Sequence, residues 1–549
     1  MLTKLVIRNF KLFEDVEIEL AQNVIFVGPN NAGKTSALQA LALWSSGVQR
    51  WHEKREGGNL PGKRPGVTLN RRDLISLPAP AANLLWRDLH VRQSVSESGT
   101  QKTRNVQIQI EVNGTDIGNE WHTELEFEYA NEESFYCRSR LGPDGKRHEV
   151  PRAAAEVRLA YLPPMSGLTA LETRLDEGAI GVRIGEGRTA EVLRNLCKLV
   201  ADRSPAKWRT ITERMRELFG VELDEPEYIS GRGEIVMTFR TQSGIRLDLS
   251  ASGRGQQQTL LLLAHMAANP GAVILLDEPD AHLEILRQRQ IYQLLTTTAI
   301  ETGSQIIAAS HSEVILNEAA SRDTVIAFVG KPHRIDDRGS QVLKALKEIG
   351  FEHYMQAEEK GWVLYLEGAT DLAILRAFAK TLKHPVQESL SSPFVHYVAN
   401  QPKLAVDHYF GVREAVPGLK GLALYDNLGR APIENPSLVQ LMWRKNEIEN
   451  YLCQEQTLLA WAKAEALKQG GDLFSGSWAD IMATCIEKGV EALKFRRKSA
   501  WDDDLKSSDE FLDPLFALFY EQVGLPNLMR KTNFHTLAEF VPQSLLDPE

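Results

Sequence analysis

The sequence predicts an α/β protein with two successive units, each built on a parallel sheet, and two observations lead to this prediction. Three apolar runs, at 24–27, 272–279 and 305–312, have the composition of strands buried on both faces, and helical patterns separate them along the chain. The same alternation of strand and helix starts again near Gly361. Buried strands that alternate with helices are typical of a parallel sheet covered by helices.

Length and composition limit the class of protein. The chain has 549 residues, of which 43% are hydrophobic and 25% charged, so it is globular and too long for one small module. With 63 Lys and Arg against 73 Asp and Glu, the net charge is −10, so any contact with nucleic acid must come from local basic patches. The four cysteines form no C-x-x-C pair, and no apolar run approaches the roughly 18 residues that cross a bilayer. We therefore expect a soluble, cytoplasmic protein with no membrane contact.

The first 330 residues predict one large unit with an inserted lobe. Its first elements are expected to be three strands and a helix, at 4–9, 16–20, 24–27 and 34–43. The segment 45–73 is rich in Gly, Pro and charge, with seven basic and three acidic residues, and predicts an exposed insertion. Alternation with period two at 105–114 and 121–130 predicts an antiparallel lobe.

The remaining residues predict a second α/β unit and a helical end. Strands are expected at 363–368, 394–400 and 421–427, and the residues from 438 onward are expected to be mostly helical. The charged stretch 330–341 marks the seam between the units. The predicted organisation is a first domain at 1–330 with an insertion at about 45–160, a linker at 331–360, a second domain at 361–455 and a helical region at 456–549.

The strongest motif is a phosphate loop between a buried strand and the start of a helix. Residues 28–35 read GPNNAGKT and fit G-x-x-x-x-G-K-[ST] without a mismatch. In such a loop backbone amides surround the β-phosphate, the lysine bridges the β- and γ-phosphates, and the hydroxyl binds Mg²⁺. The ATP-binding residues expected here are Gly28, Asn30, Asn31, Gly33, Lys34, Thr35 and Ser36, and Thr35 is also an expected Mg²⁺ ligand.

Two later segments supply catalytic candidates. The run ILLDEP at 274–279 places Asp277 and Glu278 at the end of a buried strand. Such a carboxylate alone is often a helix cap, but beside a phosphate loop we expect Asp277 to hold Mg²⁺ and Glu278 to orient or deprotonate the attacking water. His311 ends the next buried strand and is either a core histidine or, as the topology favours, a contact of the γ-phosphate.

A small polar run, LSASGRGQQQ at 249–258, opens a strongly apolar helix, and Ser and Gly amides at a helix N-terminus form an anion site. Since the chain already has a phosphate loop, a second anion site is best explained by the ATP of a partner protomer. Together these motifs resemble an ABC-type ATPase head of the SMC and RecF branch. The resemblance implies ATP held between two heads, with Ser252 and Gly253 facing the partner's phosphate loop and Asp280 in the dimer loop. The run is looser than LSGGQ, and the long coiled-coil arms of SMC proteins are absent.

The second unit contains carboxylates at expected strand ends. VLYLEGATD at 363–371 places Glu367 after a strand and Asp371 in the first turn of a helix, and Asp426 ends a later strand. Glu447 and Glu449 follow in NEIENYL. Convergent carboxylates of this kind hold hard cations for phosphodiester chemistry, whereas Asp371 taken alone has the position of a helix cap.

This unit resembles a Toprim domain over about residues 361–455, and with the ATPase head before it the chain is similar to the OLD-family nucleases and related ATPase–Toprim anti-phage proteins. EGATD matches their E-G-x-x-[DE] motif. The resemblance implies that Glu367 acts as acid or base. It also implies that Mg²⁺ or Mn²⁺ is held by Glu367, Asp371, Asp426 and by Glu447 or Glu449.

One position departs from the Toprim pattern. Toprim proteins carry D-x-D at the second strand, whereas this chain has Asp426, Asn427 and Leu428. Losing one anionic ligand weakens or abolishes a metal site. Asn427 offers a neutral oxygen, and Glu434 is near in sequence. A basic cluster at 494–498 is either a phosphate contact or a solvated helix face.

The sequence therefore favours an ATP-gated defence nuclease, in which a dimer or larger oligomer of ATPase heads controls a metal-dependent site acting on nucleic acid. The alternative is an ATPase sensor and scaffold whose degenerate Toprim-like domain binds and releases a partner effector. A RecF-like repair ATPase fits the head but leaves the second domain unexplained. Expected partners are a second copy of the chain, nucleic acid, and a phage-encoded trigger or effector protein.

Overall fold

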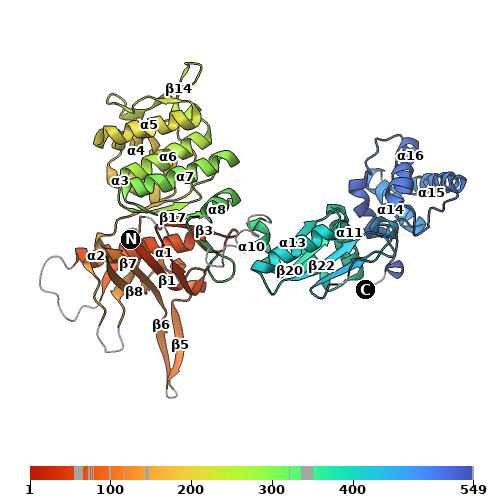
Figure 1. Ribbon diagram of the computed structural model, residues 1–549, viewed down its shortest axis with the longest axis horizontal. Helices are drawn as coiled ribbons and strands as arrows, with labels where there is room; N and C mark the ends of the chain where they lie inside the picture. Colours follow the sequence, from red (N-terminus) through yellow and green to blue (C-terminus); the bar gives the residue numbers. More distant parts are fainter. Residues whose placement is uncertain are drawn as a thin grey trace. The chain divides into compact units, whose positions relative to one another are not determined.

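A computed structural model of the chain divides into two compact units, residues 1–343 and 344–549 (Figure 1). The structure describes residues 1–546 except 55–65, 72–73, 76, 78, 98–99, 117, 142–146, 321, 336–349, 434 and 471. Among the described residues, no helix combines the length and the apolar character that a bilayer crossing requires. The two units are described one at a time.

Unit 1 contains an antiparallel sheet of six strands in the order β2, β1, β7, β8, β9, β4. The period-two alternation of the sequence becomes the alternate burial of β7. The buried side chains pack against the helix that follows the phosphate loop, so this sheet forms one wall of the core. The strands are β1 (Leu2–Phe10), β2 (Phe13–Glu19), β4 (Val67–Asn70), β7 (Gln107–Asp116), β8 (Asn119–Asn131) and β9 (Ser134–Ser139).

The second sheet of unit 1 runs β10, β16, β17, β3, β18, β19, and all its pairs are parallel except the last. The central strands β3, β16 and β17 are buried at every position, as their apolar composition predicts. Their carboxyl ends therefore meet at one edge of the sheet. The strands are β3 (Asn23–Val27), β10 (Leu159–Leu162), β16 (Val273–Asp277), β17 (Gln305–Ser310), β18 (Thr324–Ala327) and β19 (His333–Arg334).

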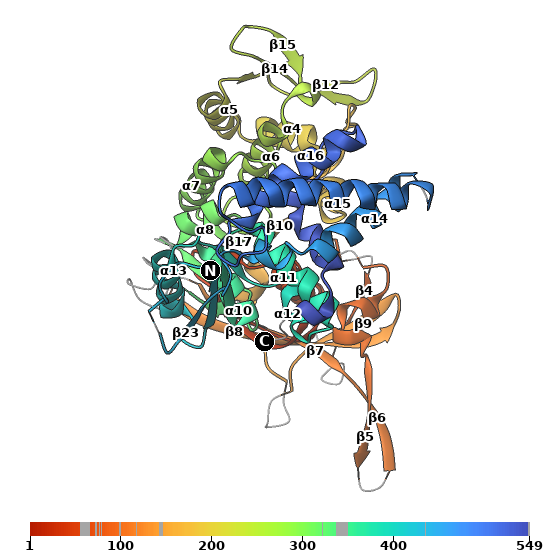
Figure 2. The ribbon, with the colours of Figure 1, turned by 90° about the vertical axis from the view of Figure 1, so that its right-hand side faces the viewer.

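Helix α1 (Lys34–Glu53) lies between the two sheets of unit 1 and contacts strands of both. Trp44 is fully buried, donates from Nε1 to Thr123 Oγ1 at 2.8 Å and stacks on Trp121. The remaining long helices gather on the other face of the parallel sheet (Figures 1 and 2). They are α4 (Leu193–Arg203), α5 (Pro205–Phe219), α6 (Arg254–Ala268) and α7 (Ile285–Thr302). The shorter helices of unit 1 are α2 (Arg152–Glu156), α3 (Glu177–Gly185) and α8 (Glu313–Ala319).

Small antiparallel ribbons complete unit 1. The ribbon of β5 (Arg92–Glu97) and β6 (Thr100–Asn105) extends away from the antiparallel sheet in both views (Figures 1 and 2). Three further strands form a small sheet in the order β11, β14, β15, and two more form a hairpin. These strands are β11 (Glu222–Leu223), β12 (Glu227–Ile229), β13 (Glu234–Val236), β14 (Thr238–Arg240) and β15 (Arg246–Asp248).

One side chain joins the two sheets of unit 1 directly. Gln305, at the start of β17, is 4% exposed. Its Oε1 accepts the N–H of Leu2 at 2.8 Å, and its Nε2 donates to the carbonyls of Leu2 and Ala21, each at 2.7 Å. A buried amide with its bonds made in this way fixes the first strand of one sheet against a central strand of the other.

Unit 2 is built on a parallel sheet in the order β21, β20, β22, β23. Helices α10 and α13 cover the face that carries Tyr365, and α11 packs on the face that carries Leu364 and Leu366. The elements are α10 (Phe351–Lys360), β20 (Trp362–Leu366), α11 (Ala369–Leu382), α12 (Val386–Ser391), β21 (Val395–Tyr397), α13 (Pro402–Ala415), β22 (Lys420–Tyr425) and β23 (Leu438–Met442).

The C-terminal part of unit 2 is helical, with a hydrophobic core of its own. The helices are α14 (Glu455–Gly470), α15 (Asp472–Phe495) and α16 (Asp513–Val523), followed by a 3-10 segment, Lys531–Phe540. Trp461 of α14 packs edge-on against Phe516 and Phe519 of α16. The core extends to Ile374 of α11, so the helical part packs onto the sheet domain.

Three predicted boundaries differ from the structure. The expected exposed insertion at 45–73 begins too early, because α1 continues to Glu53, and much of its basic segment lies outside the described residues. The expected helical region from 438 begins instead with strand β23, an edge strand with alternate burial that is too short to stand out in the sequence. The expected linker at 331–360 contains α10, whose Phe351 and Tyr354 are buried against unit 2.

The close approach of α13 to β22 requires a glycine at position 421. A Cβ there would lie 2.6 Å from Leu438 Cδ1 and 2.8 Å from the ring of Tyr409, whose hydroxyl is held by the carbonyls of Leu419 and Ser437. We expect Gly421→Ala to destabilise unit 2 by about 1–3 kcal/mol, the usual cost of overpacking a core. Urea unfolding, together with hydrogen exchange of peptides from α13 and β22, measures this loss.

Gly418→Ala is the matched control, because a Cβ at this exposed position meets nothing within 4 Å. It should unfold like the parent chain. Equal stability of the two variants would contradict the packing described for β22.

Candidate ATPase and carboxylate sites

The phosphate loop follows β3 and has a backbone that requires glycine at two positions. Gly28 has a φ of 151° and Gly33 a φ of 101°. A Cβ on Gly28 would lie 2.6 Å from the carbonyl oxygen of Phe328, and one on Gly33 would lie 2.7 Å from the ring of Phe13. Both the positive φ and the missing space exclude larger residues, so the loop keeps its backbone close to the groups around it.

Lys34 begins α1 and is 5% exposed. Its Nζ donates to the carbonyls of Gly28 and Pro29 at 2.7 and 2.8 Å and lies 3.4 Å from His311 Nδ1. Burial lowers the pKa of Lys34 to about 8, while the charges of Asp277 and Glu278 act in the opposite direction. The lysine therefore stays protonated near neutral pH and points its charge into the loop, where a phosphate would bind.

Asp277 ends β16 and faces the start of α1. Its Oδ1 accepts the hydroxyl of Thr35 at 3.2 Å, and its Oδ2 accepts the hydroxyl of Tyr161 at 3.4 Å. The carboxylate is 5% exposed, and burial raises its pKa. A hydroxyl and a buried carboxylate in contact are the pair that holds Mg²⁺ in phosphate-loop ATPases, as predicted for Thr35 and Asp277.

Glu278 and His311 face each other beside the loop. His311 Nε2 lies 3.5 Å from Glu278 Oε1, and burial followed by the charge of Lys34 lowers the pKa of His311. Glu278 has a left-handed backbone, with a φ of 51°, and its N–H donates to Ala309 O at 2.9 Å. Such a conformation is rare for glutamate and costs roughly 1–3 kcal/mol, and strain of this kind is concentrated at functional sites.

These residues line a cavity of about 460 Å³. An adjoining cavity is lined by Asn30, Glu278, Asp280, Ala281 and His311. Burial raises the pKa of Asp280, whose Oδ1 accepts no hydrogen bond from the described residues. The first cavity is lined by Leu12, Asn30, Asn31, Ala32, Gly33, Lys34, Thr35, Ser36, Asp277, Glu278 and His311, so the structure brings the predicted nucleotide and catalytic residues together.

Ser252 and Gly253 lie elsewhere, at the exposed start of α6, and neither is among the described residues that line the two cavities. The loop before α6 is anchored by Asp248, whose Oδ1 accepts the N–H and the hydroxyl of Ser250. The same oxygen accepts a hydrogen bond from Nη2 of Arg194 at 2.9 Å. Arg194 is 1% exposed, so a buried cation holds the loop from behind.

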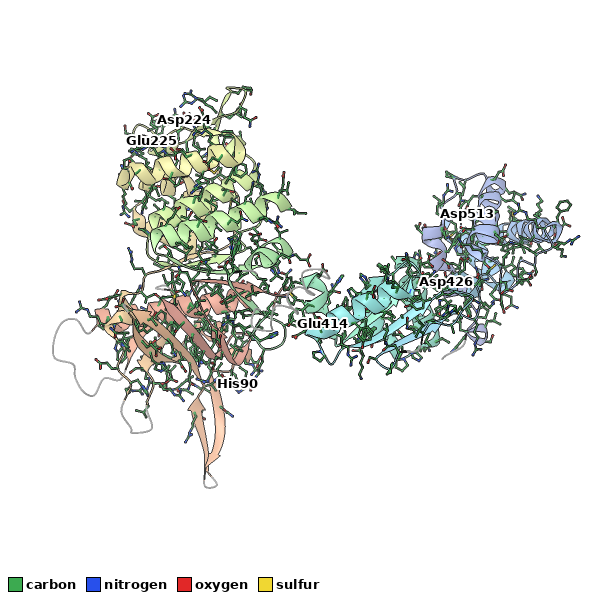
Figure 3. The ribbon with its side chains drawn as sticks, viewed as in Figure 1. His90, Asp224, Glu225, Glu414, Asp426 and Asp513 are labelled. Atoms are coloured by element: carbon green, nitrogen blue, oxygen red, sulfur yellow. The ribbon has the colours of Figure 1, made fainter. Side chains whose placement is uncertain are left out.

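In unit 2, Asn400 joins two of the predicted carboxylates. Its Nδ2 donates to Glu367 Oε2 at 2.5 Å and to Asp426 Oδ2 at 3.0 Å, and its Oδ1 accepts the N–H of Asp426 at 3.0 Å. Glu367 follows β20. Asp426, which is labelled in Figure 3, follows β22. Because β20 and β22 are parallel neighbours, their carboxyl ends place both carboxylates at one edge of the sheet.

Two further carboxylates lie close to this pair. Asp371 Oδ2 accepts the N–H of Glu367 at 3.1 Å, so it caps the turn and also faces the site. Burial and the charge of Glu367 raise the pKa of Asp371 to about 6. Burial, followed by the charges of Glu447 and Asp371, raises the pKa of Glu449 to about 7. Burial and the hydrogen-bonded Glu367 raise the pKa of Asp426 well above its usual range.

Glu447 has a different role from Glu449. It caps the 3-10 turn Ile448–Tyr451, and its Oε1 accepts the N–H of Ser508 at 2.5 Å. These bonds hold the helical part of unit 2 to the sheet, which makes Glu449 the better candidate ligand of the two. Among the described residues, no three of the predicted carboxylates bring oxygens within 4.8 Å of one another.

The departure at position 428 has a structural explanation. Leu428 packs against the hydrophobic core under the sheet, and its N–H donates to Met442 Sδ at 3.2 Å. An aspartate there would be drawn into apolar surroundings. Asn427 donates from Nδ2 to the carbonyl of Arg444 at 3.3 Å, and the proposed substitute Glu434 lies outside the described residues.

Several residues of the two sites were not predicted. Asn400 belongs to no recognisable sequence motif. Tyr161 and Arg194 are distant in sequence from their partners, Asp277 and Asp248, and contact them only in the folded chain. Lys506 forms an ion pair with Asp509 at 2.5 Å, and the hydrogen bond and charge of Asp509, followed by the charges of Glu447 and Glu367, raise its pKa. In the predicted basic cluster at 494–498, by contrast, Lys498 pairs with Glu510.

The geometry of unit 1 defines a P-loop ATPase domain, and comparisons with known proteins agree. Residues 1–63 match the family model of the AAA ATPase domain, and residues 183–317 match the model described as AAA domain, putative AbiEii toxin, Type IV TA system. The prediction of an ATP-hydrolysing domain in the first 330 residues is thereby confirmed. Both matches end before unit 2, so the resemblance of that unit to Toprim domains stays a prediction.

The solved structures that match the chain include ATPase heads. The SMC head domain from Thermotoga maritima has a TM-score of 0.34 and 14% identity, covering 61% of this chain and 98% of that chain. A Pyrococcus furiosus Smc head domain, bound to the C-terminal domain of ScpA, has a TM-score of 0.37 and 15% identity, covering 63% and 99%. The recombination mediator RecF has a TM-score of 0.33 and 12% identity, covering 61% and 98%. No curated protein sequence matches the chain.

The position of Glu278 predicts a separation of ATP binding from hydrolysis. Glu278→Gln keeps the side-chain shape but removes the base, and general-base catalysis contributes about 10²- to 10⁴-fold in rate. We therefore expect hydrolysis to fall by at least about 10²-fold while ATP binding is retained. Phosphate release and binding of a fluorescent ATP analogue measure the two effects.

Glu284→Gln is the matched control, since Glu284 is exposed at the start of α7 and its side chain caps nothing. It should hydrolyse ATP like the parent chain. Hydrolysis by Glu278→Gln at the parent rate would refute the catalytic role given to Glu278.

Proposed function

We propose that ATP binding and hydrolysis by unit 1 control a metal-dependent nuclease site in unit 2, and that the protein serves in defence against phage. The observation that carries the nuclease proposal is a group of carboxylates around the carboxyl edge of a parallel sheet: Asp371 and Glu449 are buried, Asp426 is half-buried and Glu367 is exposed. The description of one matched family as a type IV toxin–antitoxin component is in keeping with a defence role.

The carboxylates have the chemistry of a site for Mg²⁺ or Mn²⁺. Hard cations prefer carboxylate oxygens, and several buried carboxylates without a cation repel one another. Burial is the largest cause of the raised pKa values of Asp371, Asp426 and Glu449, and repulsion by neighbouring carboxylates adds to it; a divalent cation would relieve this repulsion. When bound, the cation supplies charge for a transferring phosphate.

The residues have separate roles in this proposal. Asp371, Asp426 and Glu449 hold the cation, and Asn400 positions Glu367 and Asp426. Glu367 lies at the tip of β20 and serves as acid or base at the phosphodiester. Lys506, which is about half exposed and paired with Asp509, provides a positive charge for the nucleic-acid backbone.

The gating part of the proposal depends on a dimer of ATPase units. The exposed start of α6, with Ser252 and Gly253, offers an anion site that its own cavity does not use. ATP in one protomer supplies the anion for the α6 of the second. A phage-encoded trigger would then act by favouring or opposing this dimer.

The second candidate function is an ATPase sensor and scaffold with an inactive second unit. Two observations favour it. Leu428 stands in place of an expected ligand and packs against the hydrophobic core. In addition, no three carboxylates of the described residues bring oxygens within 4.8 Å of one another. In this case unit 2 binds and releases a partner effector.

Cleavage assays separate the two functions. With Mn²⁺ or Mg²⁺ and ATP, we expect the full chain to cut plasmid DNA or tRNA, and Glu367→Gln to lower the rate by at least about 10²-fold, because it removes the proposed acid or base. Glu388→Gln, at an exposed carboxylate of α12, should cut like the parent. Lys34→Ala should no longer bind ATP, so adding ATP should not change its rate of cleavage. Absence of metal-dependent cleavage by the parent chain would favour the scaffold.

Proton release on metal binding tests the ligands independently of cleavage. The pKa values of Asp371 and Glu449 are about 6 and about 7, so below these values each carboxyl holds a proton that a cation must displace. The third proposed ligand, Asp426, has a pKa of about 8. Without nucleotide, the affinity for Mn²⁺ should therefore rise with pH up to about 8 and then level off. Calorimetry in buffers of different ionisation enthalpy counts the protons released.

Glu449→Gln should flatten this pH dependence, whereas Glu388→Gln should leave it unchanged. A pH-independent affinity of the parent chain would show that Mn²⁺ does not bind at these carboxylates.

A further inference from the structure

Three histidines converge in unit 2 apart from the carboxylate site. His353 lies on α10, His396 on β21 and His408 on α13. One ring nitrogen of each lies within 4.8 Å of the other two, and this is the only group of three such donors within the described residues. His408 is 9% exposed, and the other two are half-buried.

The rings are already oriented toward one another. His408 Nε2 lies 2.9 Å from His353 Nδ1, a hydrogen bond between two potential metal ligands. The rings of His396 and His408 are stacked with centroids 3.9 Å apart. The other nitrogen of His408, Nδ1, lies 2.9 Å from the buried hydroxyl of Tyr365.

We propose that His353, His396 and His408 form a binding site for Zn²⁺, with the fourth position taken by water or another small ligand. Zinc binds histidine nitrogens at about 2.0–2.1 Å in tetrahedral geometry, which sets ligand nitrogens about 3.3 Å apart. The bonded pair is slightly closer than this, so its rings need only separate a little. His396 must swing out of its stack to complete the set.

The contact of Tyr365 with His408 supports the assignment. Metal-bound histidine donates its second N–H to an outer partner, which fixes the tautomer of the ring. With Nε2 on the metal, Nδ1 of His408 carries the proton and donates it to the Tyr365 oxygen. Burial and the neighbouring imidazoles lower the pKa values of His408 and His396.

A purely structural role explains the group less well. The same face of the sheet is otherwise filled by apolar and tyrosine side chains, including Phe394, Tyr409 and Tyr425. Such a core can be filled without three imidazoles from three separate elements. Burying a polar ring also costs free energy unless its nitrogens are hydrogen-bonded or bind a metal. Bound zinc would fasten α10 to β21 and α13, since each element supplies one ligand.

The site differs in chemistry from the carboxylate site. Neutral imidazoles suit Zn²⁺ and Co²⁺, whereas the carboxylates suit Mg²⁺ and Mn²⁺. Saturating Mg²⁺ therefore leaves the histidines free for a transition metal. The proposal does not depend on nuclease activity.

Metal binding to the untagged full chain tests the proposal. In excess Mg²⁺ we expect one equivalent of Zn²⁺ per chain, and Co²⁺ in its place should give the visible absorption of a tetrahedral site. His353→Gln and His396→Gln should each weaken Zn²⁺ binding by at least about 100-fold, and Tyr365→Phe by about 10-fold, as for loss of an outer-shell partner. Zn²⁺ should also raise the Tm of the parent but not of the two histidine variants.

Two controls separate this site from others. His90→Gln, at an exposed histidine of unit 1 (Figure 3), and Glu367→Gln in the carboxylate site should both bind Zn²⁺ like the parent. Loss of the equivalent in Glu367→Gln would place the metal at the carboxylates and overturn the proposal. Absence of tight binding by the parent, or equal binding by the histidine variants at an unchanged Tm, would overturn it as well.

Discussion

Negative charge held at the carboxyl edges of two parallel sheets is the constraint on which the structure depends. Asp277 in unit 1 and Asp371 and Glu449 in unit 2 are each at most 7% exposed. Burying a carboxylate is costly unless a cation or hydrogen-bond donors compensate it. Unit 1 supplies Lys34 and two hydroxyls close to Asp277, and its carboxylates need only the Mg²⁺ that accompanies ATP. Unit 2 offers Asn400 and the more distant Lys506, so the described residues compensate a smaller share of its buried negative charge.

The sequence predicted most accurately those features that depend on neighbours in the chain. The phosphate loop is a local structure, and its glycines, Lys34 and Thr35 could be named without the fold. The sequence also identified Asp277, Glu367 and Asp426, because each is the first charged residue after an apolar run and so marks the end of a buried strand. Parallel pairing then brings such strand ends together, so the contact of Glu367 with Asp426 follows from topology.

The residues that escaped prediction act over long distances in the chain or without a pattern. Asn400 looks like any loop asparagine until the sheet places it between two carboxylates. The full length of α1 was missed because Gly47 suggests a break. In the folded chain it gives the room for Leu125 and Cys137 to pack on the helix. Likewise, the three histidines belong to separate elements, and only the packing of α10 and α13 on one face of the sheet unites them.

Gln305 has a mechanical consequence for the ATPase unit. Its amide ties Leu2 and Ala21 to the beginning of β17, and the other end of β17 leads to His311 beside the phosphate loop. Sliding β17 along its axis relative to the first strand of the antiparallel sheet would break the two buried hydrogen bonds to Leu2 at once. Unit 1 therefore behaves as a stiff frame along this direction. A shift of His311 along the axis of β17 would therefore pass through Gln305 to Leu2 and the antiparallel sheet instead of being absorbed by slippage between the two sheets.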